Sequence, residues 1–150
     1  MENFNTDQKL HPSEFLKEDD LFYPCREQAT RHKDNCYLYA PTYYLSFHRD
    51  DYVGALRWCE GAESLYKSTC ARGVGSQAIK ENINNPKFVE AICMNSKKTQ
   101  IESCIYGMVD VYINHYGSLQ PATIMCAELE SLNKETCYYV VGSNVRAFVE

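Results

Sequence analysis

Eight cysteines are the residues of this chain best suited to chemistry, and they form four equally spaced pairs. Ten residues separate the two members of each pair: Cys25/Cys36, Cys59/Cys70, Cys93/Cys104 and Cys126/Cys137. The first cysteines of successive pairs follow one another at intervals of 34, 34 and 33 residues. Paired cysteines can form disulfides, bind a metal ion or exchange thiols, and the spacing bears on each of these possibilities.

The spacing favours four local disulfides. Eight paired cysteines in 150 residues are typical of a protein from an oxidising compartment. Zinc-binding cysteines usually enclose about two to four residues, which the gaps of ten do not match, so we expect no metal and no cofactor. A C-x-x-C redox motif is absent, and four equivalent pairs indicate structural bridges. A thiol–disulfide redox protein and a small-ligand-binding helical domain stay open as alternatives.

The elements that carry the cysteines are predicted to be helices, a short one before each first cysteine and a longer one after each second. After Cys104, the apolar residues Ile105, Met108, Val109 and Ile113 recur at helical spacing, as on a helix with one buried face. The residue before each second cysteine is a favoured N-cap: Asn35, Thr69, Ser103 and Thr136. We therefore expect the second cysteine at the first helical position of each unit.

The segments between paired cysteines are predicted to be solvated connections, because they are polar and lack apolar periodicity. Two of them carry one leucine each, Leu65 and Leu132, which we expect to pack against its own hairpin. Gly73 and Gly107 share the column three residues after the second cysteine. Glycine inside a helix costs about 1 kcal/mol relative to alanine, so its repetition indicates a close approach of neighbouring helices there.

These patterns predict an all-α protein, an α-solenoid of about four αα-hairpin repeats of about 34 residues with one disulfide per hairpin. Residues 1–20 are expected to form an N-terminal extension or cap. Residues 21–150 are expected to form a single helical-repeat domain whose units start near Cys25, Cys59, Cys93 and Cys126.

The period and the paired helices over residues 25–149 resemble the tetratricopeptide and Sel1-like superfamily, especially its cysteine-stapled secreted members. The tetratricopeptide pattern of Trp, Leu-Gly, Tyr, Ala and Pro is not reproduced. The segments Tyr66–Gly75 and Thr136–Gly142 are similar to repeated units of uncharacterised microbial cysteine-repeat proteins. The resemblance implies binding or scaffolding. Twin-cysteine hairpin proteins of the mitochondrial intermembrane space are an alternative, although their apolar stripe runs between the cysteines.

Charge and hydropathy exclude several classes of function. The net charge of −5 argues against nucleic-acid binding, which depends on basic patches. No apolar run approaches the roughly 20 residues of a membrane-spanning helix. The cysteines predict an extracytoplasmic location: secreted, periplasmic or at the cell surface. The first residues lack the basic start and apolar stretch of a signal peptide, so export would use a removed signal or another route.

The twelve tyrosines suggest where a partner would bind. Tyrosine combines a large contact area with a polar tip and is enriched at interfaces. Four of them fall off the apolar stripes of the predicted helices and are the candidate partner-binding residues: Tyr39, Tyr43, Tyr106 and Tyr139. No catalytic constellation stands out, so we expect a non-enzymatic scaffold or interaction module that binds a protein, a peptide or a copy of itself.

Overall fold

The structure of the chain, a computed structural model, describes residues 16, 17 and 19–148. Every regular element in that part of the chain is a helix, which confirms the predicted all-α class. The elements are α1 (Tyr23–Arg26), α2 (Thr30–Phe47), α3 (Tyr52–Cys59), the 3-10 turn η1 (Ser64–Tyr66), α4 (Lys67–Glu81), α5 (Pro86–Cys93), α6 (Lys98–Tyr116), α7 (Leu119–Glu128), α8 (Ser131–Ser143) and α9 (Val145–Phe148). The predicted extension over residues 1–20 lies almost wholly outside the described residues.

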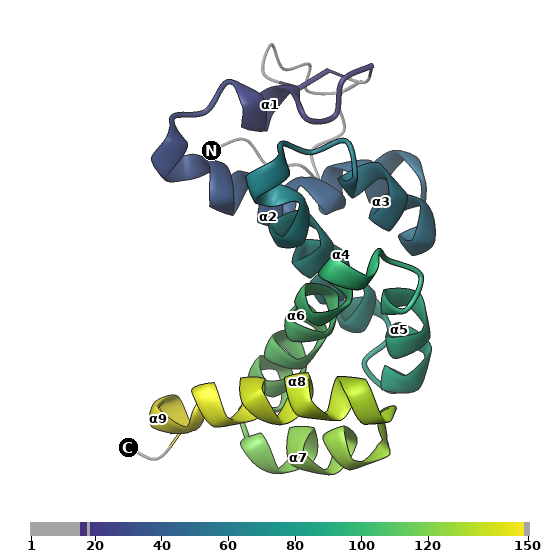
Figure 1. Cartoon of the computed structure of the whole chain (residues 1–150), viewed down its shortest axis with the longest axis vertical. Coiled ribbons are helices and arrows are strands. Elements are labelled where there is room, and N and C mark those ends of the chain that lie inside the picture. Colours follow the sequence, from purple (N-terminus) through teal and green to yellow (C-terminus); the bar gives the residue numbers. More distant parts are fainter. Residues whose placement is uncertain (1–15, 18, 149–150) are drawn as a thin grey trace.

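The helices pair into four hairpins, called here units 1 to 4, which follow one another along an elongated stack (Figure 1). The pairs are α1 with α2, α3 with α4, α5 with α6, and α7 with α8. One disulfide staples each unit, with Cα–Cα distances of 5.4 to 5.6 Å: Cys25–Cys36, Cys59–Cys70, Cys93–Cys104 and Cys126–Cys137. These are the four predicted pairs, and no cysteine is free.

The long helices begin earlier than the sequence analysis predicts. They start at Thr30, Lys67, Lys98 and Ser131, so each second cysteine lies inside its helix. The four predicted N-caps are helical residues instead: Asn35, Thr69, Ser103 and Thr136. The prediction was wrong because a polar segment can be helical as well as a loop. In α6, for example, the polar residues before Cys104 form helical turns that are largely open to solvent, and such turns need no apolar stripe.

The predicted apolar stripe forms the core of unit 3. Ile105, Met108, Val109 and Ile113 are fully buried, and they belong to one continuous cluster that also contains the cysteines of units 2, 3 and 4. Each unit alone is too thin to enclose such a core, so burial comes from stacking unit on unit.

Two glycines bring neighbouring long helices into backbone contact, as their shared column predicts. A Cβ atom on Gly73 of α4 would overlap the carbonyl oxygen of Leu38 in α2. A Cβ atom on Gly107 of α6 would overlap the carbonyl oxygen of Arg72 in α4 in the same way. The third junction differs, because Val140 takes this column in α8. Accordingly, α8 makes far fewer close backbone contacts with α6 than α4 does.

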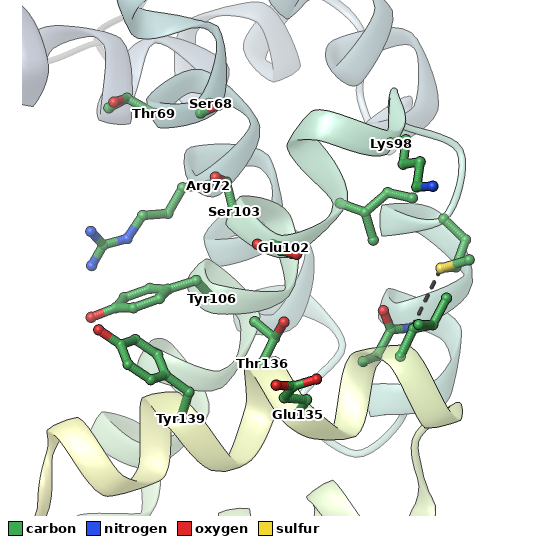
Figure 2. A pocket seen from close by; sticks show the side chains of 14 residues that line it. Ser68, Thr69, Arg72, Lys98, Glu102, Ser103, Tyr106, Glu135, Thr136 and Tyr139 are labelled. Atoms are coloured by element: carbon green, nitrogen blue, oxygen red, sulfur yellow. Dashed lines mark hydrogen bonds between the residues drawn. The ribbon is translucent and has the colours of Figure 1, made fainter.

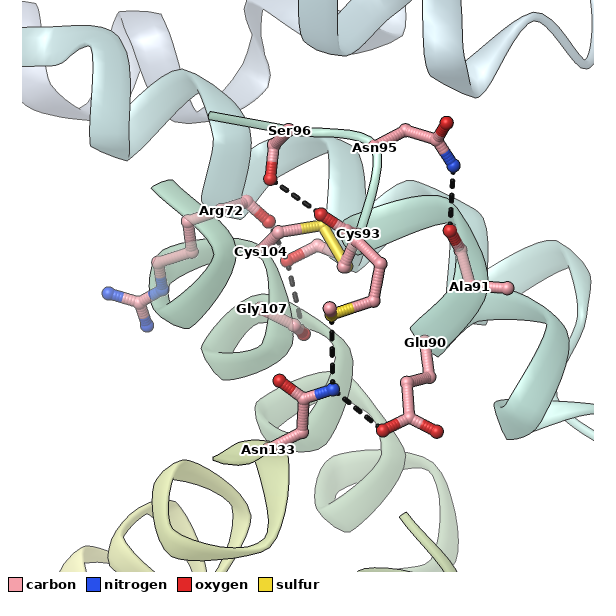
Figure 3. Close-up of a disulfide and its surroundings, with 11 residues drawn as sticks. Arg72, Glu90, Ala91, Cys93, Asn95, Ser96, Cys104, Gly107 and Asn133 are labelled. Atoms are coloured by element: carbon pink, nitrogen blue, oxygen red, sulfur yellow. Dashed lines mark hydrogen bonds between the residues drawn. A yellow bond between two sulfur atoms is a disulfide. The ribbon is translucent and has the colours of Figure 1, made fainter. Parts of the chain in front are cut away.

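A buried carboxylate links unit 3 to unit 4 (Figure 3). The Oε1 atom of Glu90 in α5 accepts hydrogen bonds from the backbone N–H of Glu130 and from Nδ2 of Asn133, both at 2.7 Å. Glu90 and Asn133 are each buried. The carboxylate thereby satisfies a free donor at the start of α8 and compensates for its own burial.

A partly buried carboxylate links unit 2 to unit 3 and gives the fold a dependence on pH. Glu60, just after α3, pairs with Lys97 at the start of α6, and with Lys67 at 3.9 Å. The hydrogen bond from Lys97 is the main reason that the pKa of Glu60 is lowered. A carboxyl group whose pKa is lower in the folded state stabilises the fold above its unfolded pKa, about 4.3.

We expect this contribution to disappear as the pH falls below about 4.3, because protonation removes the charge that Lys97 binds. Glu60→Gln should therefore lower the free energy of unfolding at pH 7 by up to about 1 kcal/mol and reduce its loss at acid pH. Urea unfolding between pH 7 and pH 3 measures both effects. Glu102→Gln, which removes a carboxylate at an exposed position of α6, is the matched control. Equal pH profiles for Glu60→Gln and the unchanged chain would contradict this account.

Candidate interaction groove

The structure places the four candidate tyrosines in different surroundings. Tyr39 in α2 and Tyr139 in α8 are 52% and 69% exposed, and Tyr106 in α6 is half-buried. Tyr43 is only 1% exposed and packs edge-on against Phe47, with ring centroids 5.2 Å apart. The prediction that Tyr43 belongs to an exposed surface was therefore wrong. A single apolar stripe implies that only one face of α2 is buried. Tyr37 and Tyr43 lie on different sides of this helix, and both are buried.

Tyr106 and Tyr139 come together in a groove of about 700 Å³ between α4, α6 and α8 (Figure 2). The looser junction between α6 and α8, where a valine replaces the glycine, leaves room for it. The groove is open to solvent along the stack, and side chains from units 2, 3 and 4 line it. We call it the α4–α6–α8 groove.

One repeat column forms the end of the groove that carries the tyrosines. Arg72, Tyr106 and Tyr139 each lie two residues after the second cysteine of their unit. The guanidinium of Arg72 lies over the Tyr106 ring, 4.2 Å from its centroid, and its Nη2 atom lies 3.4 Å from Asp110 Oδ2. Figure 2 shows the Tyr106 and Tyr139 hydroxyls turned toward each other. Sequence reasoning missed Arg72, although the repeat alignment places it in register with the two tyrosines.

A second column supplies hydroxyl groups to the same wall. Thr69, Ser103 and Thr136, which the sequence analysis assigned to helix caps, instead line the groove. Each of these residues comes directly before a buried cysteine in the sequence. Because successive residues of a helix point in different directions, the side chain before the cysteine faces the groove rather than the core. These hydroxyls can both donate and accept hydrogen bonds.

The other end of the groove is apolar. Met94, Ile101 and Leu132 line it, and Leu132 is 81% exposed. The prediction that Leu65 and Leu132 pack against their own hairpins was wrong, since both side chains are exposed. Leu65 lies in η1, just before α4, and Leu132 lies in the first turn of α8, and the stack leaves both side chains open to solvent.

The charges along the groove are mixed. Lys98 and Arg72 supply positive charge, and Glu102 and Glu135 supply negative charge. A site of this kind has no preference for a strongly acidic or strongly basic ligand. It offers aromatic, hydroxyl and apolar contacts within one open channel.

The fold holds all eight cysteines in disulfides, and only Cys36 is partly exposed. The second cysteines lie inside helices rather than at their first positions. The four disulfides indicate an oxidising compartment.

In the part of the chain that the structure describes, no group of three or more His, Cys, Asp or Glu side chains is arranged to hold a metal ion. Among the same residues, no helix combines the length and the apolar character needed to cross a bilayer. A scan of protein-family models, a search of curated proteins and a search of solved structures each found no match to the chain, so the tetratricopeptide-like resemblance rests on period and helix pairing.

Proposed function

We propose that this protein is a non-enzymatic interaction module of an oxidising, extracytoplasmic compartment, and that it binds an extended peptide segment of a partner in the α4–α6–α8 groove. The observation that carries the proposal is the column of Arg72, Tyr106 and Tyr139, which three units present side by side in an open channel. Tyr139 is too exposed to have a role in the core.

The form of the groove supports an extended peptide as the ligand. Its lining repeats from unit to unit, so it offers similar contacts at regular steps along the stack. Hydroxyl and carboxylate oxygens on the wall can accept hydrogen bonds from peptide N–H groups. The apolar end at Leu132 and Met94 can receive an aliphatic or aromatic side chain.

The groove tyrosines should carry most of the affinity. We expect Tyr139→Ala to weaken binding of a groove peptide by about tenfold or more, because exposed aromatic side chains at interfaces are frequent binding hot spots. Peptides would be selected from a displayed random library against the folded protein, and their affinity measured by fluorescence anisotropy at low protein concentration.

The chain offers a matched control one residue away. Tyr138 is 44% exposed on the same helix but does not line the groove, so Tyr138→Ala should change the affinity less than about twofold. Selected peptides that bind both variants equally, or a library that yields no binder, would contradict the groove as the binding site.

A further inference from the structure

Unit 4, the last described unit of the stack, exposes a helix face whose equivalent in α4 is buried. In α4, the residues one, five and eight positions after the second cysteine are Ala71, Gly75 and Ala78, all buried beside α6. In unit 4, the same three columns hold Tyr138 and Gly142 of α8 and Val145, the first residue of α9. All three are exposed, Tyr138 to 44% and Val145 to 42%. We call this the α8 end face.

The glycine column shows what kind of element fits that face. A Cβ atom on Gly75 would overlap the carbonyl oxygen of Cys104 in α6, so the absence of a side chain is what lets the next helix approach. Gly142 occupies the same column, yet a Cβ atom there would meet nothing within 4 Å. Gly142 therefore lies in the column where a neighbouring helix crosses closely in α4, but no described helix crosses α8 there.

The first unit presents the reciprocal face. Cys70, Cys104 and Cys137 are fully buried, whereas Cys36 is partly exposed because no described unit precedes it. Three residues after it, Tyr39 is exposed in the column where α4 and α6 carry their contact glycines. We call this surface of α2 the α2 end face.

We propose that a second copy of this chain docks its α2 end face on the α8 end face, so that molecules stack head to tail. The contact between α4 and α6 inside each molecule is the template for this docking. There the carbonyl oxygen of Cys104 in α6 lies against Gly75 in α4. The α2 end face cannot approach a neighbouring helix as closely as α6 approaches α4 at Gly107, because the Tyr39 side chain occupies that column. The α6–α8 junction, with Val140 in the same column, shows that units also stack with a large residue there.

Head-to-tail contacts use two different faces and leave one of each free, so they generate chains rather than closed dimers. Sedimentation velocity from 1 µM to 1 mM should show the average mass of the protein rising with concentration. Gly142→Arg and Tyr39→Arg should each weaken this association at least about tenfold, because each blocks one of the two faces. Neither substitution disturbs the monomer, since Gly142 has open space around it and Tyr39 points largely into solvent.

Mixing the two variants gives the decisive result. The intact α2 end face of Gly142→Arg can meet the intact α8 end face of Tyr39→Arg, so the mixture should form one-to-one dimers and nothing larger. Ser143→Arg, exposed on another side of α8, should associate like the unchanged chain. A protein that stays monomeric to 1 mM overturns the proposal, and so does a Tyr39→Arg variant that associates normally, as a symmetric α8–α8 dimer would.

This inference is independent of the peptide groove. Neither Tyr39 nor Gly142 lines the groove, so both arginine variants should bind groove peptides with unchanged affinity. Loss of association with retained peptide binding, or the reverse, shows which of the two proposals has failed.

Discussion

Replacing Gly107 by alanine should lower the free energy of unfolding by about 2–3 kcal/mol, although alanine is the better helix former. The added methyl group would overlap the carbonyl oxygen of Arg72 in the backbone of α4, which cannot turn aside as a side chain could. The helices α4 and α6 would have to separate along the most extensive helix contact in the described chain. Chemical denaturation followed by circular dichroism measures the change.

Gly142→Ala is the matched control, and it should have the opposite sign. The substitution is the same, the position is also helical, and nothing lies within 4 Å of the new atom. Helix propensity alone then acts, so we expect the monomer to gain up to about 1 kcal/mol. Measurements at low concentration keep association out of the comparison. If Gly107→Ala were as stable as the unchanged chain, the close crossing of α4 and α6 would be wrong.

Removing the Cys93–Cys104 disulfide should be the second large effect. Replacing both cysteines by alanine frees a short loop in the unfolded chain, since 11 positions separate the two residues. The chain-entropy model gives a loss of about 3 kcal/mol for a loop of this size. For a chain of about 150 residues this corresponds to a fall in Tm of about 6–12 °C, which differential scanning calorimetry measures.

The terminal pair provides the comparison. Replacing Cys25 and Cys36 by alanine opens a loop of the same length, but in a unit that has one neighbouring unit among the described residues. In a stack governed by contacts between adjacent units, its loss should unfold unit 1 locally and affect the main transition less. Equal effects from the two double variants would mean that the units do not act as separate stapled elements.

The regular columns of the sequence predict much of this fold. Cysteine spacing gives the pairing of the four units, and the shared glycines Gly73 and Gly107 give the close helix contacts, because both signals repeat in register. Helix starts could not be found this way. The first turns of α6 and α8 are mostly polar and largely exposed, and a polar helical turn resembles a loop when periodicity is the only guide.

The groove could be predicted only in part. Tyr106 and Tyr139 are identifiable because they lie off the apolar stripes, but their meeting with Arg72 depends on how α8 crosses α6. That crossing depends on Val140 at a position where the other junctions have glycine, and sequence columns do not give its angle. The burial of Tyr43 likewise follows from packing on a second face of α2, which a single apolar stripe does not reveal.

The described chain is a stack of four units, each closed by its own disulfide. Peptide mapping by mass spectrometry without reduction checks this pairing, because eight cysteines allow 105 fully paired connectivities. We expect four linked peptide pairs and no free thiol: 25–36, 59–70, 93–104 and 126–137. A crossed pair such as 25–70 with 36–59, or a free thiol in the native protein, would contradict the stack of stapled units.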